Sequence, residues 1–422
     1  MTADALSRNV RRLGHLDLPG GGQVIFDGKG HAIVGHMKPP YGTTILDVSN
    51  PSRPTVVSEI RLDDDQSHTH KVRVAGDIMI TNVEENERHA KRRAGRLKAL
   101  EAEWAARHGR PATDAELAAA LKVKPEAIPG LRRIQPQPYE QGGFKIWDIA
   151  DRSRPRLLAY QRTFGFGVHR FDMDERYAYI STEMEGYRGN ILVIYDISNP
   201  EKPEEVSRWH LPGQHVAAGE TPTWSGESHR LHHALRQGDD LWAAVWYAGV
   251  RRIDVTDIAR PRTVGAFNYH PPTPEPTHTV LPAKGLIGGR RIAVAVDEEH
   301  DHTPGQPHAH LWIFDVTEGD FRPLSTFHVS DLDSPYARLG RFGAHQFQEH
   351  IDGSLVYCAW FSGGLRVVDI SNPEEPSEVG RYIPEPVGGN ASPQTNDVDV
   401  DADGLIAIID RNSGFDLLVH EG

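Results

Sequence analysis

The chain has 422 residues, a quarter of them charged, and a formal net charge of −13 at pH 7. This acidic balance argues against nucleic acid as a partner, because nonspecific nucleic-acid binding needs a basic surface. A single cysteine, Cys358, excludes internal disulfides, and the lack of an apolar run that could serve as a signal segment or membrane span leads us to expect a cytoplasmic protein with no membrane partner.

Strand patterns begin close to the N-terminus. The stretch VRRLGHLDL at 10–18 is typical of an outer strand, but no partner strands come before it. Apolar strand patterns separated by turn residues then follow at 23–27, 31–36, 43–48 and 55–62. Their lengths and spacing predict one complete four-stranded antiparallel unit.

A second unit begins at His70 but is interrupted after its second strand. Residues 85–142 are rich in Ala, Leu, Arg and Glu at helical spacing, and Thr113 with Glu116 forms a capping box before AELAAAL. In an antiparallel meander the end of the second strand lies on the face where the innermost strand begins. We therefore predict a helical lid, 85–142, over that face; a partner-binding element is the alternative.

One sequence repeat recurs along the chain, most clearly as LVIYDISNPEKPEEVSRW at 192–209. Each copy has a strand, a polar turn and a second strand. Its first strand ends in an Asp, which we expect to accept hydrogen bonds from turn amides. The six copies place this residue at Asp47, Asp148, Asp196, Asp254, Asp315 and Asp369. Repeats of about 50 residues are typical of four-stranded propeller blades.

The last unit has strand patterns at 396–400, 405–410 and 415–420 and stops one strand short. The N-terminal strand would complete it and so remove an exposed sheet edge. The sequence thus predicts an all-β, seven-bladed β-propeller made of residues 1–84 and 143–422. It is closed by the N-terminal strand and carries the helical insertion in its second blade.

Histidines open the innermost strands of five consecutive units, where they would surround the mouth of a central channel. Neutral imidazoles that converge on one point are ligands for a divalent metal. We predict a transition-metal site, with iron or copper first and zinc or manganese as alternatives. The predicted ligands are His70, His169, His233, His278 and His345, with His68 an alternative to His70 and His232 an alternative to His233.

Carboxylates follow the second strands on the same face. We expect them to fix the metal-bound imidazoles or to act as catalytic bases; they are Glu84, Glu183 and Glu298. A substrate pocket beside the metal is predicted to be lined by His36, Trp246, Trp360 and Asn396.

The repeats LVIYDISNP and LRVVDISNP resemble those of LVIVD-repeat proteins, which implies a propeller but no single activity. The histidine ring is similar in plan to two families. One is the selenium-binding protein/methanethiol oxidase family, whose propeller uses copper. The other is the carotenoid cleavage oxygenases, whose propeller holds iron by four histidines backed by glutamates. The cysteine-rich motifs associated with selenium binding are missing from this chain.

An all-histidine site leaves the metal its +2 charge and open positions, which suits activation of dioxygen or Lewis-acid catalysis. The first hypothesis is a metal-dependent oxidoreductase, using dioxygen, that acts on a small aromatic or apolar substrate at the channel. A lyase or hydrolase on the same site is the second, with Glu183 or Glu298 as general base. A non-enzymatic scaffold with a structural metal is the third. The oligomeric state is left open.

Overall fold

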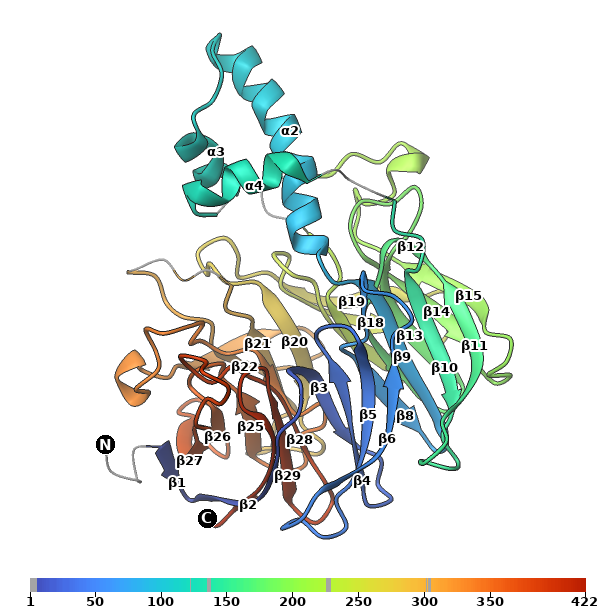
Figure 1. The fold of residues 1–422 in the computed structure, drawn as a ribbon, viewed down its shortest axis with the longest axis vertical. Coiled ribbons are helices and arrows are strands. Elements are labelled where there is room, and N and C mark those ends of the chain that lie inside the picture. The colour runs from blue at the N-terminus through green and yellow to red at the C-terminus, as the bar shows by residue number, and fades with distance from the viewer. Residues whose placement is uncertain (1–5, 122, 135–137, 225–228, 301, 303–304) are drawn as a thin grey trace.

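The computed structural model describes residues 6–422 except 122, 135–137, 225–228, 301 and 303–304. Residues 122 and 135–137 of the predicted insertion therefore lie outside the described residues. The chain has an all-β, repeat-based and propeller-like fold, with three helices standing on one side of the strands (Figure 1). None of the described helices is long and apolar enough to cross a membrane.

Antiparallel pairing gathers the strands of the first half of the chain into sets of four. These are β3 (Gly21–Phe26), β4 (His31–His36), β5 (Tyr41–Asp47) and β6 (Thr55–Arg61); then β8 (Val72–Ala75), β9 (Ile78–Glu85), β10 (Gly143–Asp148) and β11 (Arg156–Arg162); then β12 (Phe164–Met173), β13 (Tyr177–Glu183), β14 (Ile191–Asp196) and β15 (Glu204–Trp209). The short strand β7 (Ser67–His68) also pairs with β9.

The second half continues in the same way. Its sets are β16 (His233–Gln237), β17 (Asp240–Ala244), β18 (Val250–Asp254) and β19 (Arg262–Phe267); then β20 (Thr277–Pro282), β21 (Ile292–Asp297), β22 (Leu311–Asp315) and β23 (Arg322–Phe327); then β24 (Gln346–Phe347), β25 (Leu355–Ala359), β26 (Leu365–Asp369) and β27 (Ser377–Tyr382); then β28 (Thr395–Val400), β29 (Leu405–Asp410) and β30 (Gly414–His420). Short 3-10 turns lie at Val216–Ala218 and Asp331–Asp333.

The N-terminal strand β2 (Val10–Leu16) completes the set of the C-terminal strands, pairing antiparallel with β30 so that Val10 lies opposite His420. A hydrogen bond of 2.8 Å joins His15 Nδ1 in β2 to Asp416 Oδ1 in β30. The short strand β1 (Ser7–Arg8) pairs with β27 of the preceding set. The two ends of the chain are thus tied to adjacent sheets, and the edge of β30 is covered.

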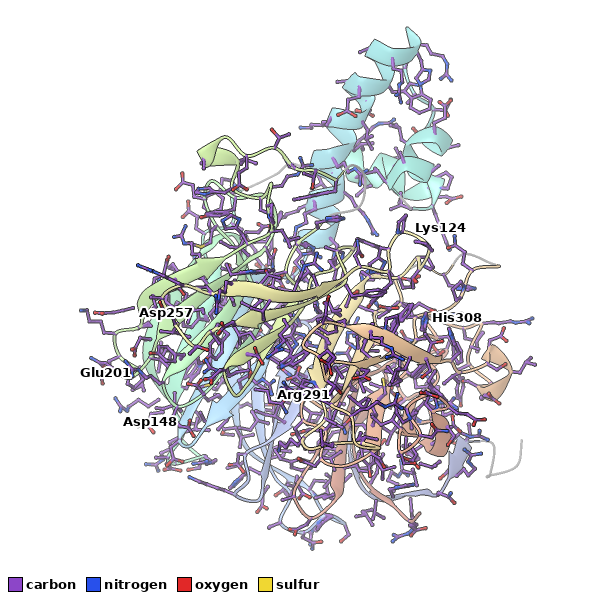
Figure 2. The ribbon with its side chains drawn as sticks, turned by 180° about the vertical axis from the view of Figure 1, so that it is seen from behind. Lys124, Asp148, Glu201, Asp257, Arg291 and His308 are labelled. Atoms are coloured by element: carbon purple, nitrogen blue, oxygen red, sulfur yellow. The ribbon has the colours of Figure 1, made fainter. Side chains whose placement is uncertain are left out.

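The repeat Asp residues have the structural role that the sequence predicted. Each accepts a hydrogen bond of 2.8–3.0 Å from the backbone amide two residues further on, which fixes the turn between the third and fourth strands. Asp148, for example, lies at the outer margin of the strands (Figure 2). The prediction for these six residues is confirmed.

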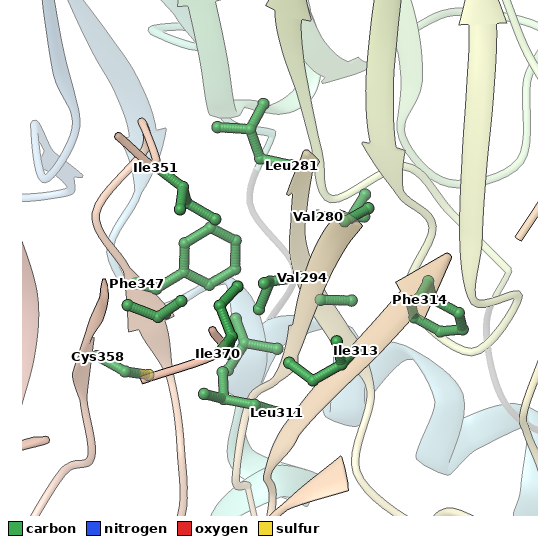
Figure 3. Packing of buried hydrophobic residues seen from close by; sticks show 14 of the residues in the cluster. Val280, Leu281, Val294, Leu311, Ile313, Phe314, Phe347, Ile351, Cys358 and Ile370 are labelled. Carbon is green, nitrogen blue, oxygen red and sulfur yellow. The ribbon is translucent and has the colours of Figure 1, made fainter. Parts of the chain in front are cut away.

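The core lies between neighbouring sheets. Strand β21 is buried at all six of its positions, since alternate side chains face the sheets on its two sides. Figure 3 shows one such interface, in which Val294 and Ile313 lie near Phe347 and Ile370. Strands covered on both faces carry continuous apolar runs, which is why the pattern IAVAVD predicts a buried strand.

The helices α2 (Arg88–His108), α3 (Asp114–Leu121) and α4 (Ile128–Arg133), with a 3-10 turn at Pro125–Ala127, come between β9 and β10. They pack on a small apolar core of their own, which includes Leu97, Leu117 and Ile128. The predicted capping box is present, because the Thr113 amide donates to Glu116 at 2.8 Å and the Glu116 amide donates to Thr113 at 3.3 Å. The first turns of α2 carry the contacts with the sheets described below.

Candidate metal centre

Histidine side chains form an arc where the innermost strands begin. Ring centroids are 4.8 Å apart for His169 and His232, 4.2 Å for His232 and His278, and 4.3 Å for His278 and His345. The arc continues to His70, whose ring lies 5.3 Å from that of His169. The side chains come from β12, β20 and the residues directly before β16 and β24.

A β-bulge places two of these side chains, His169 and His278. His169 is the extra residue between Val168 and Arg170, which pair with consecutive residues of β13, and His278 is the extra residue at the same position in β20. Bulges re-aim side chains and are frequent beside active sites. The following residue of each strand then points into a second polar layer, where Arg170 donates to Gln346 at 3.2 Å.

The hydrogen bonds of His169 and His232 fix their tautomers. His169 Nδ1 lies 2.9 Å from a carboxylate oxygen of Glu84, which can only accept, so Nδ1 carries the proton. His232 Nδ1 donates in the same way to the carbonyl oxygen of His278 at 2.7 Å. Both Nε2 atoms therefore present lone pairs, and these atoms are only 2.9 Å apart.

His278 and His345 are held in the same tautomer. His278 Nδ1 lies 2.9 Å from the Thr279 hydroxyl oxygen, and that hydroxyl donates its own proton to Gln346 at 2.6 Å. His345 Nδ1 donates to the carbonyl oxygen of Asn396. We call His169, His232, His278 and His345 the histidine tetrad: each has its Nδ1 proton bound to an outer acceptor and its Nε2 lone pair directed inward, where Arg170 lies 3.5 Å from Nε2 of His278.

Burial keeps these imidazoles neutral. For all four residues of the histidine tetrad the loss of solvent is the largest cause, and it lowers the pKa well below the ordinary histidine value. Nearby cations add to the effect, Arg88 at His169 and Arg170 at His232. A neutral imidazole is the form that binds a metal, so the site needs no deprotonation before binding.

His70 and His68 lie beside the histidine tetrad but differ from it. Asn82 donates to His70 Nδ1 at 3.1 Å, so the His70 proton is on Nε2, which has no hydrogen-bond partner. His68 has an acceptor at each ring nitrogen, the Met37 carbonyl oxygen 3.2 Å from Nδ1 and a Glu84 carboxylate oxygen 3.1 Å from Nε2. His68, His70 and Glu84 could form a second metal-binding group.

The structure places His232, and not His233, against His169. His233 lies one layer deeper, 3.4 Å from Glu349, with no hydrogen bond to either ring nitrogen. Counting back from an apolar residue suggested His233, but the second strand begins one residue earlier, at Asp240. Asp240 pairs with the repeat Asp254, just as Tyr177 pairs with Asp196. A shift of one residue moves a side chain to a different position around a strand.

Two of the three predicted carboxylates lie at the site. Glu84 contacts His68 and His169, and Glu298 lies 3.7 Å from His345 Nε2 and 3.2 Å from His300 Nε2. The structure keeps Glu183 apart from the histidine tetrad, because its carboxylate binds Arg92 at 2.7 Å and the amide of Phe166 at 3.0 Å.

The charges around Glu84 and Glu298 hold them ionised. Burial raises the pKa of a carboxyl, but at Glu84 the nearby Arg88 and His68 outweigh it, and the pKa lies below the ordinary value. At Glu298 the neighbours His300, His345 and Arg341 have the same net effect. Arg88, at the start of α2, was not predicted from the sequence as a residue of this site. It lies 2.8 Å from Glu84, and the only sequence feature that could have indicated this ion pair is the spacing of four residues between them.

The predicted pocket residues have different surroundings. Trp246 stacks on His232 at 4.9 Å and lines a cavity. Trp360 is fully buried against Phe327 in the core, and both ring nitrogens of His36 are already hydrogen-bonded, to Pro19 and Thr44. The backbone carbonyl oxygen of Asn396 accepts a hydrogen bond from His345 Nδ1.

Two aromatic residues next to the histidine tetrad adopt a strained backbone. Trp246 has φ of 47° and Phe361 has φ of 31°, a region that bulky residues rarely adopt and that costs about 1–3 kcal/mol. Phe361 stacks on His345 at 4.7 Å as Trp246 stacks on His232. Strain of this kind is typical of functional sites, and here it presses two aromatic rings against two of the four imidazoles.

A cavity of about 1610 Å³ adjoins the histidine tetrad, between the helices α2 and α3 and the loops of the neighbouring sheets. Trp246 and His300 belong to its wall and also contact residues of the metal centre. His169 keeps 12% of its side chain exposed, so the centre is not fully closed. A side cavity thus lies next to the histidine tetrad.

The fold and its repeats define the class of this protein, a repeat-built all-β protein with a propeller-like fold. The chain contains LVIVD repeats, matched at residues 42–61, 173–210 and 350–383. Among curated proteins no sequence matches it.

Solved structures with 8% sequence identity share the fold. A chain in the crystal structure of a mitotic checkpoint complex has a TM-score of 0.54, with 99% of this chain and 95% of that chain covered. The computationally designed Ika8 protein has a TM-score of 0.50, with 96% and 98% covered. At this identity the similarity concerns the fold alone.

Proposed function

We propose that the histidine tetrad binds one divalent transition metal, iron or copper, and that the protein is a metal-dependent oxidoreductase. The observation that carries the proposal is the 2.9 Å separation of the Nε2 atoms of His169 and His232, both with lone pairs. Two such lone pairs repel each other unless a cation lies between them. Ligand nitrogens about 2.0–2.1 Å from a metal, at a right angle, would be about 3 Å apart.

The ligand type favours redox chemistry. Four neutral imidazoles leave the full positive charge on the bound ion, which supplies dioxygen activation or electron transfer. The protein's residues orient the ligands and shape the pocket. Glu84 orients His169, the Asn396 carbonyl orients His345, and Trp246 provides an apolar wall on the cavity side. A small molecule in the adjoining cavity would be the substrate.

We also propose that the sets of four strands form seven blades around this centre, with α2–α4 inserted in the second blade as a lid. The pairing of β2 with β30 and the placement of the helices between β9 and β10 support this arrangement. The cavity between the helices and the sheets supports the role of a lid over a substrate site.

The carboxylates favour the oxidoreductase over a hydrolase or lyase. Glu84 and Glu298 have lowered pKa values and lie against arginines, so neither is poised to take a proton near neutral pH, and Glu183 lies apart from the histidine tetrad with its carboxylate bound to Arg92. The adjoining cavity favours an enzyme over a scaffold with a structural metal, since a structural site has no open position.

The test is the metal content of protein purified without a histidine tag, compared with His232→Ala and with His233→Ala as the matched control. We expect about one iron or copper per chain in the parent protein and in His233→Ala, and none in His232→Ala, because only His232 belongs to the tetrad. Circular dichroism checks that both variants fold. Full metal retention in His232→Ala would refute the proposal, and stoichiometric zinc would replace the redox function by a lyase or hydrolase.

A further inference from the structure

The cavity beside the metal centre is strongly cationic, although the whole chain carries a net charge of −13. Among its described lining residues, six positively charged side chains face two carboxylates. The six are Arg92, Arg93, Arg96, Lys124, Arg188 and Arg230, and the two are Glu183 and Glu275. A concave wall of one charge sign concentrates its field inside the cavity and attracts the opposite charge.

Two cations of this wall, Arg230 and Arg92, have donors without an acceptor among the described residues. Arg230 has no ion pair or hydrogen bond with any residue that the structure describes; its guanidinium lies 4.6 Å from the ring centre of Trp246. Arg92 binds Glu183 at 2.7 Å through one terminal nitrogen, while the other is buried without a hydrogen-bond partner among the described residues. A buried donor without an acceptor is costly, so Arg92 favours an incoming anion, and the half-buried guanidinium of Arg230 adds a second cation beside it.

The carboxylates of the wall do not provide that anion. Glu183 is already bound by Arg92 and by the amide of Phe166. Burial raises the pKa of Glu275 to about 7, so close to neutral pH a large share of this group is uncharged. Within the described part of the cavity wall, these two carboxylates therefore leave Arg230 and the second terminal nitrogen of Arg92 without a bound anion.

Aromatic rings stand beside these charges. Trp246, Tyr247, Trp224 and Phe166 line the same cavity, and Arg230 lies over the face of Trp246. Trp246 in turn stacks on His232 of the histidine tetrad. A planar apolar body that packed on these rings would hold an acidic group at the arginines and a neighbouring atom close to the metal centre.

We propose that the cavity binds a small molecule with an apolar, aromatic body and an anionic group, a carboxylate, sulfate or phosphate, held by Arg230 and Arg92. This proposal narrows the substrate class of the proposed oxidoreductase. It rests on that function only where it assigns this ligand as the substrate. Binding itself needs no metal. Part of the charge comes from the insertion, from α2 and from Lys124, which lies where the helices face the sheets (Figure 2).

The test measures binding to protein that has been stripped of metal with a chelator, so that its result is independent of the metal question. The probes are 2-naphthoate, 2-naphthalenesulfonate and 2-naphthyl phosphate, with neutral 2-naphthamide as the uncharged control, in isothermal titration calorimetry. We expect at least one of the three anions to bind about tenfold or more tightly than the amide, with an affinity that falls as salt is added.

The matched variants are Arg230→Gln, in the cavity, and Arg176→Gln, whose side chain binds Asp196 on an outer strand. Arg230→Gln is expected to weaken the anion about tenfold or more and to leave the amide unchanged, whereas Arg176→Gln changes neither. Equal affinity for anions and amide, or no binding of any anion, would overturn the proposal. Anion binding that appears only after metal is restored, and that is equally strong in Arg230→Gln, would also overturn this proposal. That result would not contradict the proposed metal site.

Discussion

The acceptors on Nδ1 decide what the histidine tetrad can bind. They differ in kind: a carboxylate at His169, carbonyl oxygens at His232 and His345, and a hydroxyl at His278. Each of them fixes a tautomer and a ring orientation, which raises the affinity of the free Nε2 for a metal. The hydroxyl is the acceptor that can be removed with the least change in shape and no change in charge.

Thr279→Val should therefore weaken metal binding while leaving the fold. The valine keeps the volume but leaves the Nδ1 proton of His278 without an acceptor, and loss of such a partner typically costs 10–100-fold in metal affinity. Competition with a chelator of known affinity measures the change. Thr279→Ser, which keeps the hydroxyl, should bind metal as the parent does; equal affinity in the valine variant would mean that this hydrogen bond does not orient the ligand.

At the residue scale, the sequence predicts only part of the candidate site. Strand starts could be located to within a residue, which placed His169, His278 and His345 in the arc. It was not enough to choose between His232 and His233, because neighbouring residues of a strand point to opposite sides, and only the folded chain shows that His232 lies against His169 and His233 against Glu349. The contact of Arg230 with Trp246 could not be foreseen, since only the folded chain brings these two side chains together.

At the scale of elements, the repeated strand–turn–strand unit was readable because local chemistry dictates it. The Asp of each copy binds the amide of its own turn, and strands covered on both faces need continuous apolar residues. The insertion was also predictable, from its composition and its capping box. The position of its helices over the sheets depends on contacts such as that between Arg92 and the distant Glu183, which no local pattern encodes.

The pairing of β2 with β30 should depend on pH through His15. The hydrogen bond with Asp416 is the largest cause that raises the pKa of His15 above its ordinary 6.5. The stabilisation is therefore fully present below about pH 6.5 and is lost as the pH rises through the raised folded-state pKa. With a third of the His15 side chain exposed, we expect at most about 1 kcal/mol.

Melting temperatures of the parent and His15→Gln, compared across pH, measure this contribution. The parent should be the more stable protein at pH 6, and the difference should shrink toward zero at pH 9. A difference that is constant over this range would show that the protonated histidine does not contribute to the closure.

At the scale of the whole molecule, the second polar layer of the channel ties distant sheets together. Glu349, after β24, binds Arg170 of β12 at 2.7 Å and also Arg73 of β8. Arg170 is almost completely buried and has no other carboxylate partner within the described structure. Glu349 thus bridges two guanidinium groups that come from different strand sets, and Arg73 has a second carboxylate partner, Asp172, at 3.3 Å.

Glu349→Ala should destabilise the protein by about 3–5 kcal/mol, because it leaves Arg170 buried without a counter-charge. Urea denaturation followed by circular dichroism measures the free energy of unfolding. The control is Glu374→Ala, which removes a surface ion pair with Arg290 and should cost less than about 1 kcal/mol. Similar losses in the two variants would contradict a stabilising role for the buried network.

The central claim is the position of a metal among four imidazoles, and anomalous diffraction at the absorption edge of the bound metal tests it most directly. We predict one peak about 2.0–2.2 Å from the Nε2 atoms of the histidine tetrad. Within the described structure, His232 and His278 also form a possible ion site with Glu298, and two groups outside the tetrad could hold an ion, one with His68, His70 and Glu84 and one with Glu299, His302 and His308. A peak at either of these instead, or no peak in metal-loaded crystals, would contradict the assignment of the histidine tetrad as the metal centre.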